Sequence, residues 1–176
     1  MIVGISGKMG TGKTVLANHL AELCGGRVVS FADALRSEVA DVFSLPLAAM
    51  TSRECKEHML VPVGFNPMSV RQLLQWWGAL RRESDQDYWV RQLIESVAGD
   101  ELVLVDDVRY RNEARVIREE GGMMIRLDPY DGWQRGIGAD HLSETDLDDG
   151  VAFDWRSAPA FGQLQPLAVQ LAGLIG

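Results

Sequence analysis

The most constraining feature of this sequence is the segment GKMGTGKT at residues 7–14, which directly follows a short apolar run at residues 1–6. Its spacing is that of a phosphate-binding loop, G-x-x-x-x-G-K-[ST]. The apolar run predicts a buried strand, and residues 15–23 carry apolar side chains at helical spacing. Strand, glycine-rich loop and helix therefore occur in the order that such a loop requires, which argues against a chance glycine-rich turn.

The chemistry of the loop predicts a nucleotide site. Its glycines let the backbone turn so that successive N–H groups surround a phosphate at the positive end of the following helix. We expect Lys13 to reach the β- and γ-phosphates of ATP and the Thr14 hydroxyl to bind Mg²⁺. The residues expected to bind the nucleotide are Gly7, Lys8, Gly10, Thr11, Gly12, Lys13 and Thr14.

Composition excludes some classes of partner. With 176 residues, 47% of them hydrophobic and 24% charged, the chain is most simply one globular domain over residues 1–176. Its formal net charge of -8 argues against binding a nucleic acid polymer, because phosphate backbones are bound by basic surfaces. A small anionic ligand needs only a local cluster of Arg and Lys, so it remains compatible.

The cysteine content and the first residues bear on the compartment. Cys24 and Cys55 lie far apart without metal-ligand spacing, which indicates a reduced, cytoplasmic compartment. The chain enters a core strand at once, without a basic leader or a long apolar segment. We therefore expect no signal peptide and no association with a membrane.

A helix predicted to begin at residue 31 carries the next candidates. Asp33 and Arg36 share one of its faces, where they either contact a substrate or form a local surface ion pair. Spacing alone does not separate these alternatives. In an architecture built around a phosphate-binding loop, a helix after the second strand flanks the cleft, so both residues are candidates for substrate contact.

Two further segments lie before the next strand. Residues 61–68, which include Pro62 and Pro67, are predicted to form a mobile loop. Ser69 and Gln72 then form a capping-box pattern that begins a helix.

The run LVLVDD at residues 102–107 is the second informative stretch. Four consecutive apolar residues suit a strand buried on both faces of a parallel sheet, and acidic residues at its carboxyl end lie where ligands bind. This pattern resembles a Walker B strand, whose acid holds Mg²⁺ directly or through water. We therefore expect Asp107, and with it Asp106, to help bind the metal.

The last third of the chain carries weaker signals. Residues 128–140 contain three glycines and Arg135 and are predicted to form a lid-type loop. His141 is a candidate for substrate binding, with a structural hydrogen bond at least as plausible. The acidic run at residues 144–149 is predicted to be a solvated face, and residues 151–155 a strand.

Several segments together resemble one family, the bacteriophage-type deoxynucleoside monophosphate kinases. They span about residues 1–154 in the family's order, and the latter part of the series is more specific than the loop: GKMGTGKT, FADALR, RQLLQWWG, YWVRQL, VDDVRYRNEA with the following GGMMIRL, and HLSE. The resemblance implies a three-layer α/β P-loop NTPase fold with a central parallel sheet and helices on both faces. It also implies transfer of the ATP γ-phosphoryl group to a deoxynucleoside 5′-monophosphate, and location in the host cytoplasm if the chain is phage-encoded.

The resemblance further implies an acceptor-binding helical region at about residues 31–98. It suggests that the cleft is lined by Asp33, Arg36, Arg71, Gln75, Asp107, Arg109, Asn112 and Glu113. The family often carries an arginine soon after the strand equivalent to MIRL, whereas this chain has Asp128 and Pro129 there. Arg126 or Arg135 is therefore the expected lid arginine. The usual Gly-Thr-Glu after the LLQ helix is here GAL at residues 78–80, and about the last twenty residues match poorly.

Residue chemistry independently fits a monophosphate acceptor. Its attacking phosphate oxygen already carries negative charge, so catalysis needs alignment and charge neutralisation rather than a strong general base. The expected catalytic residues are Lys13, Arg36, Asp107, Arg126 and Arg135.

Three alternatives remain open. A P-loop kinase for another small acceptor, such as dephospho-coenzyme A, would use a carboxylate base for which Asp33 is a candidate. A switch module that hydrolyses ATP or GTP slowly belongs to another class, although the chain has no guanine-reading N-K-x-D stretch. The acidic balance counts against a nucleic-acid end kinase. Trp76 and Trp133 leave room for a homodimer, and burial within the monomer explains them equally well.

Overall fold

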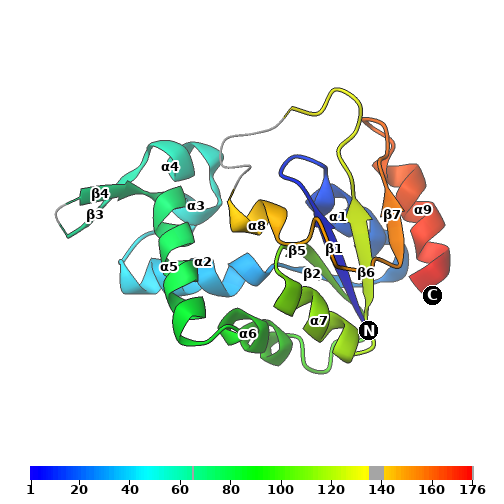
Figure 1. The fold of residues 1–176 in the computed structure, drawn as a ribbon, viewed down its shortest axis with the longest axis horizontal. Coiled ribbons are helices and arrows are strands. Elements are labelled where there is room, and N and C mark those ends of the chain that lie inside the picture. Colours follow the sequence, from blue (N-terminus) through cyan, green and yellow to red (C-terminus); the bar gives the residue numbers. More distant parts are fainter. Residues whose placement is uncertain (65, 135–140, 176) are drawn as a thin grey trace. The chain divides into compact units, whose positions relative to one another are not determined.

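The computed structural model describes residues 1–64, 66–134 and 141–175, and Figure 1 shows its helices and strands. The chain divides into two compact units. The first comprises Met1–Ser30 and Ile94–Gly176, and the second is Phe31–Leu93. Each unit has its own apolar core.

A parallel sheet forms the frame of the first unit (Figure 1). Among the described residues it has five strands in the order β2-β5-β1-β6-β7. The strands are β1 (Ile2–Gly7), β2 (Arg27–Val29), β5 (Val103–Val108), β6 (Met123–Leu127) and β7 (Trp155–Ser157). Because β1 is central and all strands run the same way, its last residues lie beside the carboxyl ends of β5 and β6: Ser6 pairs with Val108 and Gly7 with Leu127.

Helices cover both faces of this sheet. Its helices are α1 (Lys13–Cys24), α7 (Arg111–Glu119), α8 (Leu142–Thr145) and α9 (Leu164–Ile175). Val3 and Ile5 point into a core shared with α1 and α9. Gly4 faces the opposite side, where α7 approaches so closely that a Cβ on Gly4 would lie 2.7 Å from Ile117 Cδ1. The expected α/β fold, a central parallel sheet with helices on both faces, is confirmed.

The second unit is mostly helical. It contains α2 (Phe31–Val42), α3 (Leu47–Thr51), α4 (Arg53–His58), α5 (Val70–Ser84) and most of α6 (Tyr88–Ser96), with a hairpin of β3 (Leu60–Val63) and β4 (Asn66–Ser69). Val39, Met50 and Leu73 lie at the centre of its core. The capping box that begins α5 is confirmed, since the Ser69 and Gln72 side chains each accept from the other residue's backbone N–H.

Glu38 links three elements of the second unit. Its carboxylate accepts hydrogen bonds from Trp77 Nε1 at 2.8 Å, Arg81 Nε at 2.6 Å and Tyr88 Oη at 2.8 Å. Burial alone would raise the pKa of the Glu38 carboxyl, but the hydrogen bonds from Tyr88, Trp77 and Arg81 outweigh it and the pKa lies below its ordinary value. This carboxylate therefore holds α2, α5 and α6 together as an anion.

The sequence-based expectation for residues 61–68 was wrong. The segment pairs as the β3–β4 hairpin, with Pro62 opposite Pro67. In a two-stranded ribbon each strand has an unpaired edge, so a residue without an N–H is tolerated there. The strand expected at residues 151–155 lies later, as β7. Among the described residues, no helix combines the length and the apolar character needed to cross a membrane.

Candidate active site

The phosphate-binding loop lies between β1 and α1. Gly10 and Gly12 adopt φ values of 84° and 92°, a region that side-chain-bearing residues rarely enter. Gly12 is also closely approached, because a Cβ there would lie 2.4 Å from Leu164 Cδ1 of α9. The glycine spacing that identified the loop is thus required by both its conformation and its packing.

Lys13 is folded back onto this loop. Its ammonium donates to the carbonyl oxygens of Gly7 at 2.8 Å and Lys8 at 2.9 Å, and the residue is only 8% exposed. Burial and then the nearby Arg109 guanidinium lower the pKa of the Lys13 ammonium from 10.5 to about 8, against the opposing effect of surrounding carboxylates. An ammonium whose charged form is disfavoured by burial therefore lies where the motif predicts a phosphate.

Thr14 meets an acidic residue at the end of β5. Its hydroxyl donates to Asp106 Oδ2 at 2.5 Å, and Ser30 Oγ donates to Asp106 Oδ1 at the same distance. Sequence reasoning named Asp107 first, whereas the carboxylate that contacts the Thr14 hydroxyl is that of Asp106. A hydroxyl and a carboxylate oxygen are hard donors that suit Mg²⁺, which takes its other ligands from phosphates and water. No cluster of three or more metal-ligating His, Cys, Asp or Glu side chains occurs within residues 1–64, 66–134 and 141–175.

Asp107 and Arg109 extend this end of β5. Asp107 is half-buried, and its charge acts on both Lys13 and Arg109, which puts it near the loop. The Arg109 guanidinium contacts the Glu144 carboxylate and lies 3.4 Å from the Ser143 carbonyl oxygen. Burial alone would lower the pKa of this guanidinium, but the Glu144 and Asp107 carboxylates outweigh it and raise the pKa above its ordinary value.

Asn112 and Glu113 lie in the first turn of α7. Glu113 is 2% exposed, and its Oε2 accepts from the backbone N–H groups of Arg109 at 2.7 Å and Tyr110 at 3.0 Å. Those bonds satisfy donors at the start of the helix, as a capping carboxylate does. Glu113 therefore fixes the turn that presents Arg109.

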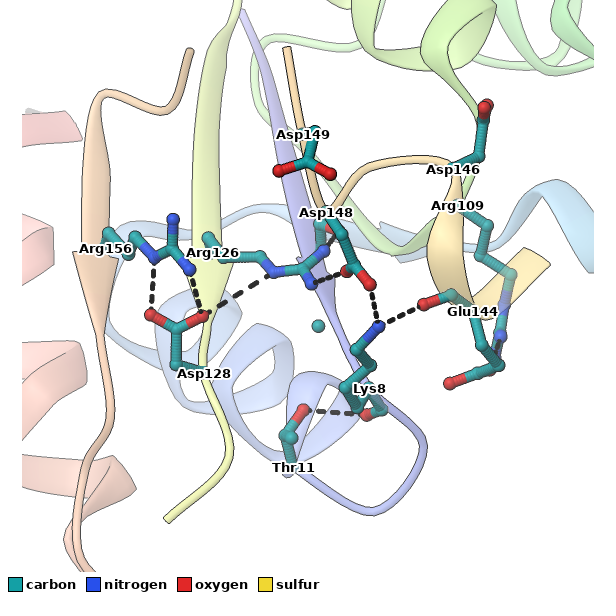
Figure 2. Close-up of polar contacts among 12 residues, drawn as sticks. Lys8, Thr11, Arg109, Arg126, Asp128, Glu144, Asp146, Asp148, Asp149 and Arg156 are labelled. Carbon is teal, nitrogen blue, oxygen red and sulfur yellow. Dashed lines mark hydrogen bonds and ion pairs between the residues drawn. The ribbon is translucent and has the colours of Figure 1, made fainter. Parts of the chain in front are cut away.

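The acidic run at residues 144–149 was expected to be a solvated face, and this was wrong for Glu144, whose side chain is only 10% exposed, whereas Asp148 is exposed. Glu144 Oε2 accepts from the Met9 N–H at 2.9 Å, and the Glu144 carbonyl accepts from Lys8 Nζ at 2.5 Å. Asp148 binds the same ammonium at 2.5 Å (Figure 2). Composition alone misses this, because these partners are over 130 residues away in the chain.

Arg126 is enclosed rather than presented to a lid. It is 5% exposed on β6, and its guanidinium donates to Ser6 Oγ at 3.0 Å and Asp148 Oδ1 at 2.7 Å. Figure 2 shows the chain of contacts continuing through Asp128, which also accepts from Arg156 at 2.5 and 2.9 Å. This arrangement braces β6 and β7 against the acidic segment.

The remaining candidates of the first unit fall near its loops. His141 Nδ1 accepts from the Ser143 N–H at 3.2 Å and so caps α8, which matches the structural alternative. Within the expected lid, Trp133 Nε1 donates to the Met9 carbonyl at 2.9 Å. Arg135 lies outside the described residues.

Four predicted acceptor residues belong to the second unit. Asp33 and Arg36 form the local ion pair, with Oδ1 and Nη1 2.7 Å apart. Arg71 pairs with Glu57 at 3.4 Å. Gln75 lines a surface hollow together with Asn66, Pro67, Met68, Gln72 and Trp76. The structure thus separates the candidates by unit: the loop, Asp106, Asp107 and Arg109 gather in the first.

Sequence reasoning missed Ser30 and assigned Glu144 no role. The only available signal for Glu144 was the HLSE segment at residues 141–144, which contributed to the family resemblance.

Known proteins resemble this chain in sequence and in fold. No family model matches the chain. A protein of Acanthamoeba polyphaga mimivirus named "Putative deoxynucleotide monophosphate kinase" is 28% identical over 172 residues, which cover 88% of this chain and 86% of the viral protein.

Solved structures share the fold. Shikimate kinases from Acinetobacter baumannii and Aquifex aeolicus each give a TM-score of 0.52 over 99% of this chain, at 14% and 13% identity, and cover 92% and 98% of their own chains. The tunicamycin resistance protein of Deinococcus radiodurans gives 0.52 at 19% identity, covering 99% of this chain and 95% of its own.

Fold, loop and relatives together point to one class: the chain has the P-loop NTPase fold, and the proteins that it resembles are named as kinases. Within that class, the resemblance to deoxynucleoside monophosphate kinases indicated by the sequence motifs is confirmed by a relative that spans most of the chain.

Proposed function

We propose that this protein transfers the γ-phosphoryl group of ATP to a deoxynucleoside monophosphate, giving the diphosphate and ADP. The observation that carries the phosphotransferase half is the contact of Thr14 with Asp106 beside a complete phosphate-binding loop. The name of the mimivirus relative and the motifs at residues 105–127 and 141–144 support the acceptor.

We assign binding of the phosphoryl donor, ATP, to the first unit and call its residues there the donor side. The loop amides and Lys13 bind the phosphates, while Thr14 and Asp106, with Asp107 nearby, hold Mg²⁺, which supplies charge neutralisation when bound. The Arg109 guanidinium contacts Glu144, which also accepts from the Met9 N–H of the loop, so we assign this guanidinium to the transferring phosphoryl group.

Acceptor binding is assigned to the second unit. We propose that Arg36 and Arg71 hold the acceptor phosphate, and that Asp33 and Gln75 contact the rest of the nucleotide. The guanidinium groups suit this because they bind phosphate oxygens in a forked geometry.

A phosphate acceptor also fits the carboxylates near the loop. Asp106 is bound by Thr14 and Ser30, Glu113 by backbone amides, and Glu144 by Arg109 and Met9. A hydroxyl acceptor would require a carboxylate base, whereas a phosphate oxygen needs none.

Arg126 receives no catalytic role in this proposal. Its contacts with Ser6 and Asp148 favour a bracing role, which leaves Arg135 as the proposed lid arginine.

The test is an ADP-release assay with ATP and Mg²⁺ against a panel of deoxy- and ribonucleoside monophosphates. Shikimate, dephospho-coenzyme A and no acceptor serve as controls. We expect turnover that depends on a deoxynucleotide and identifies the base. Turnover with a control acceptor alone would keep the phosphotransferase and overturn the acceptor, and acceptor-independent hydrolysis would favour a switch module.

Two further expectations accompany this proposal. The reduced cytoplasm is its proposed site of action, in keeping with Cys24 and Cys55 both being free thiols. A homodimer is proposed from the exposure of Trp76, and light scattering of the purified protein tests it, with a monomeric mass as the contrary result.

A further inference from the structure

The Glu144 carboxylate bridges two parts of the candidate site. Its Oε2 accepts from the Met9 N–H of the phosphate-binding loop, and its Oε1 contacts the Arg109 guanidinium that follows β5. Its backbone carbonyl also accepts from Lys8. One residue therefore ties the loop to Arg109, and Figure 2 shows it between the α8 ribbon and Lys8.

This bridge is built rather than incidental. The Glu144 side chain is only 10% exposed, and a carboxylate is costly to remove from water unless hydrogen bonds and cations compensate it. Here each oxygen has its own partner, one a backbone amide and the other a guanidinium. The neighbouring Asp146 behaves differently, because it accepts from the Arg111 N–H at 2.8 Å and so anchors α7.

Arg109 is the part of this bridge that can affect chemistry. It follows β5, whose last residue Val108 pairs with Ser6 immediately before the loop. A guanidinium on a long side chain loses considerable conformational freedom when it is fixed. If a partner fixes it before substrate binds, that loss does not add to the barrier of the transfer step.

We propose that Glu144 is a positioning residue for phosphoryl transfer, holding the Arg109 guanidinium and the Met9 amide in the geometry that receives the transferring phosphate. The inference rests on the proposed phosphotransferase function and adds a residue to it. Glu144 acts through Arg109 and touches no reacting atom.

The experiment compares wild type with Glu144→Ala, Glu144→Gln, Arg109→Ala and the Glu144→Ala/Arg109→Ala double variant. For Glu144→Ala we expect kcat to fall about 10- to 100-fold, as for other losses of alignment, with the KM for ATP changed less than about threefold. Glu144→Gln should lie between, because its amide oxygen still accepts from Met9. The double variant should be no slower than Arg109→Ala, since Glu144 has nothing left to position.

Asp146→Asn is the matched control. It removes one carboxylate from the same segment while leaving the contacts to Met9 and Arg109 in place. Its kcat should stay within about twofold of wild type, since it lies outside the coupled pair. An equal loss in Asp146→Asn would overturn the proposal, because general disturbance of the segment would then explain the effect. Circular dichroism establishes that each variant is folded.

A second readout does not depend on the acceptor. ADP with aluminium fluoride mimics the transferring phosphoryl group, so its affinity relative to ADP alone reports on the positioned arginine even if no deoxynucleotide is phosphorylated. We expect Glu144→Ala to lose about tenfold or more in this ratio. Equal ratios in both proteins would overturn the proposal, as would fully multiplicative losses in the double variant. A gain of activity or nucleotide affinity would also overturn it, because the carboxylate would then be competing with phosphate for the loop.

Discussion

The two units hold their candidate residues in contrasting ways. In the first unit, Lys13 is 8% exposed and bound to loop carbonyls, and Thr14 is joined to Asp106. In the second, Arg36 pairs with a residue one helical turn away and Arg71 reaches Glu57 across 3.4 Å. The proposed donor side is preassembled from distant parts of the chain, whereas the proposed acceptor side relies on local surface pairs.

This difference follows from the energies of the contacts. An exposed ion pair contributes only about 0 to 1 kcal/mol, so an arginine in such a pair can turn to a phosphate at little cost. A buried ammonium held by backbone carbonyls cannot move without leaving polar groups unsatisfied. Changes in the first unit should therefore affect the chemical step, and changes in the second the binding of the acceptor.

The largest effect is expected for Lys13→Met. Loss of the ammonium should reduce phosphoryl transfer by about a thousandfold or more, because the phosphates lose the positive charge that would neutralise them. The folded protein should become more stable at pH 7 by about 1 to 3 kcal/mol, since a pKa lowered from 10.5 to about 8 marks an environment unfavourable to the cation. Coupled assay and urea unfolding measure the two effects.

Lys13→Arg is the matched control, because it keeps a cation at the same position. It should remain nearly as slow, since the forked guanidinium does not fit the two carbonyl contacts of a point charge. Near-normal turnover in Lys13→Met would remove the loop from the centre of the mechanism.

Arg36→Ala tests the contrast from the other unit. The KM for the acceptor should rise about 10- to 100-fold, as for loss of a charged hydrogen bond, while the KM for ATP changes less than about twofold. Steady-state kinetics with each substrate varied in turn measures both. Asp33→Asn is the companion variant, and we expect it to keep its turnover if the acceptor is a phosphate, which needs no carboxylate base. If the KM for ATP rose more than that for the acceptor, Arg36 would belong to the donor side.

The sequence predicted the phosphate-binding loop and the strand before Asp106 well because their signals are local. The spacing of Gly7, Gly12 and Lys13 fixes a turn whose conformation depends on adjacent residues, and the apolar run before Asp106 marks a strand buried on both faces. A parallel sheet then brings the two segments together along one edge. The fold followed from these elements with few alternatives.

The contacts of Asp106, Glu144 and Arg126 that sequence reasoning missed are long-range. Whether Asp106 or Asp107 contacts Thr14 depends on the direction of the side chains at the end of β5. There the register of the pairing between β1 and β5 changes, between Gly4 and Ser6 of β1. The partners of Glu144 and the enclosure of Arg126 depend on where the chain returns after residue 140, and no spacing within the sequence encodes that. The HLSE segment marks the position without revealing its partners.

Glu38→Gln should affect stability without changing the donor site. Glu38 receives three hydrogen bonds as an anion, so its neutral isostere should lower the free energy of unfolding by about 1 to 3 kcal/mol at pH 7. Because the pKa of this carboxyl is lower in the folded state, its contribution is present above the ordinary pKa and is lost as the pH falls through the folded value. Urea unfolding should therefore separate the two proteins at pH 7, and the difference should shrink as the pH falls below the ordinary carboxyl pKa. ATP affinity should be the same in both, and a weaker affinity in the variant would break the division between the units.

The smallest expected effect is a pH dependence of nucleotide affinity. In the free protein the pKa of Lys13 is about 8, and bound phosphates should raise it, so binding above pH 8 requires proton uptake. Affinity should thus be nearly constant below pH 7 and weaken by about fivefold between pH 8 and pH 9. Calorimetry in buffers of different ionisation enthalpy measures the protons taken up. Lys13→Met should bind more weakly but without this pH dependence, which would assign the dependence to Lys13. An affinity that stays constant to pH 9.5 in the wild type would mean that the buried ammonium keeps its proton, and that the loop carbonyls compensate its burial more fully than the lowered pKa implies.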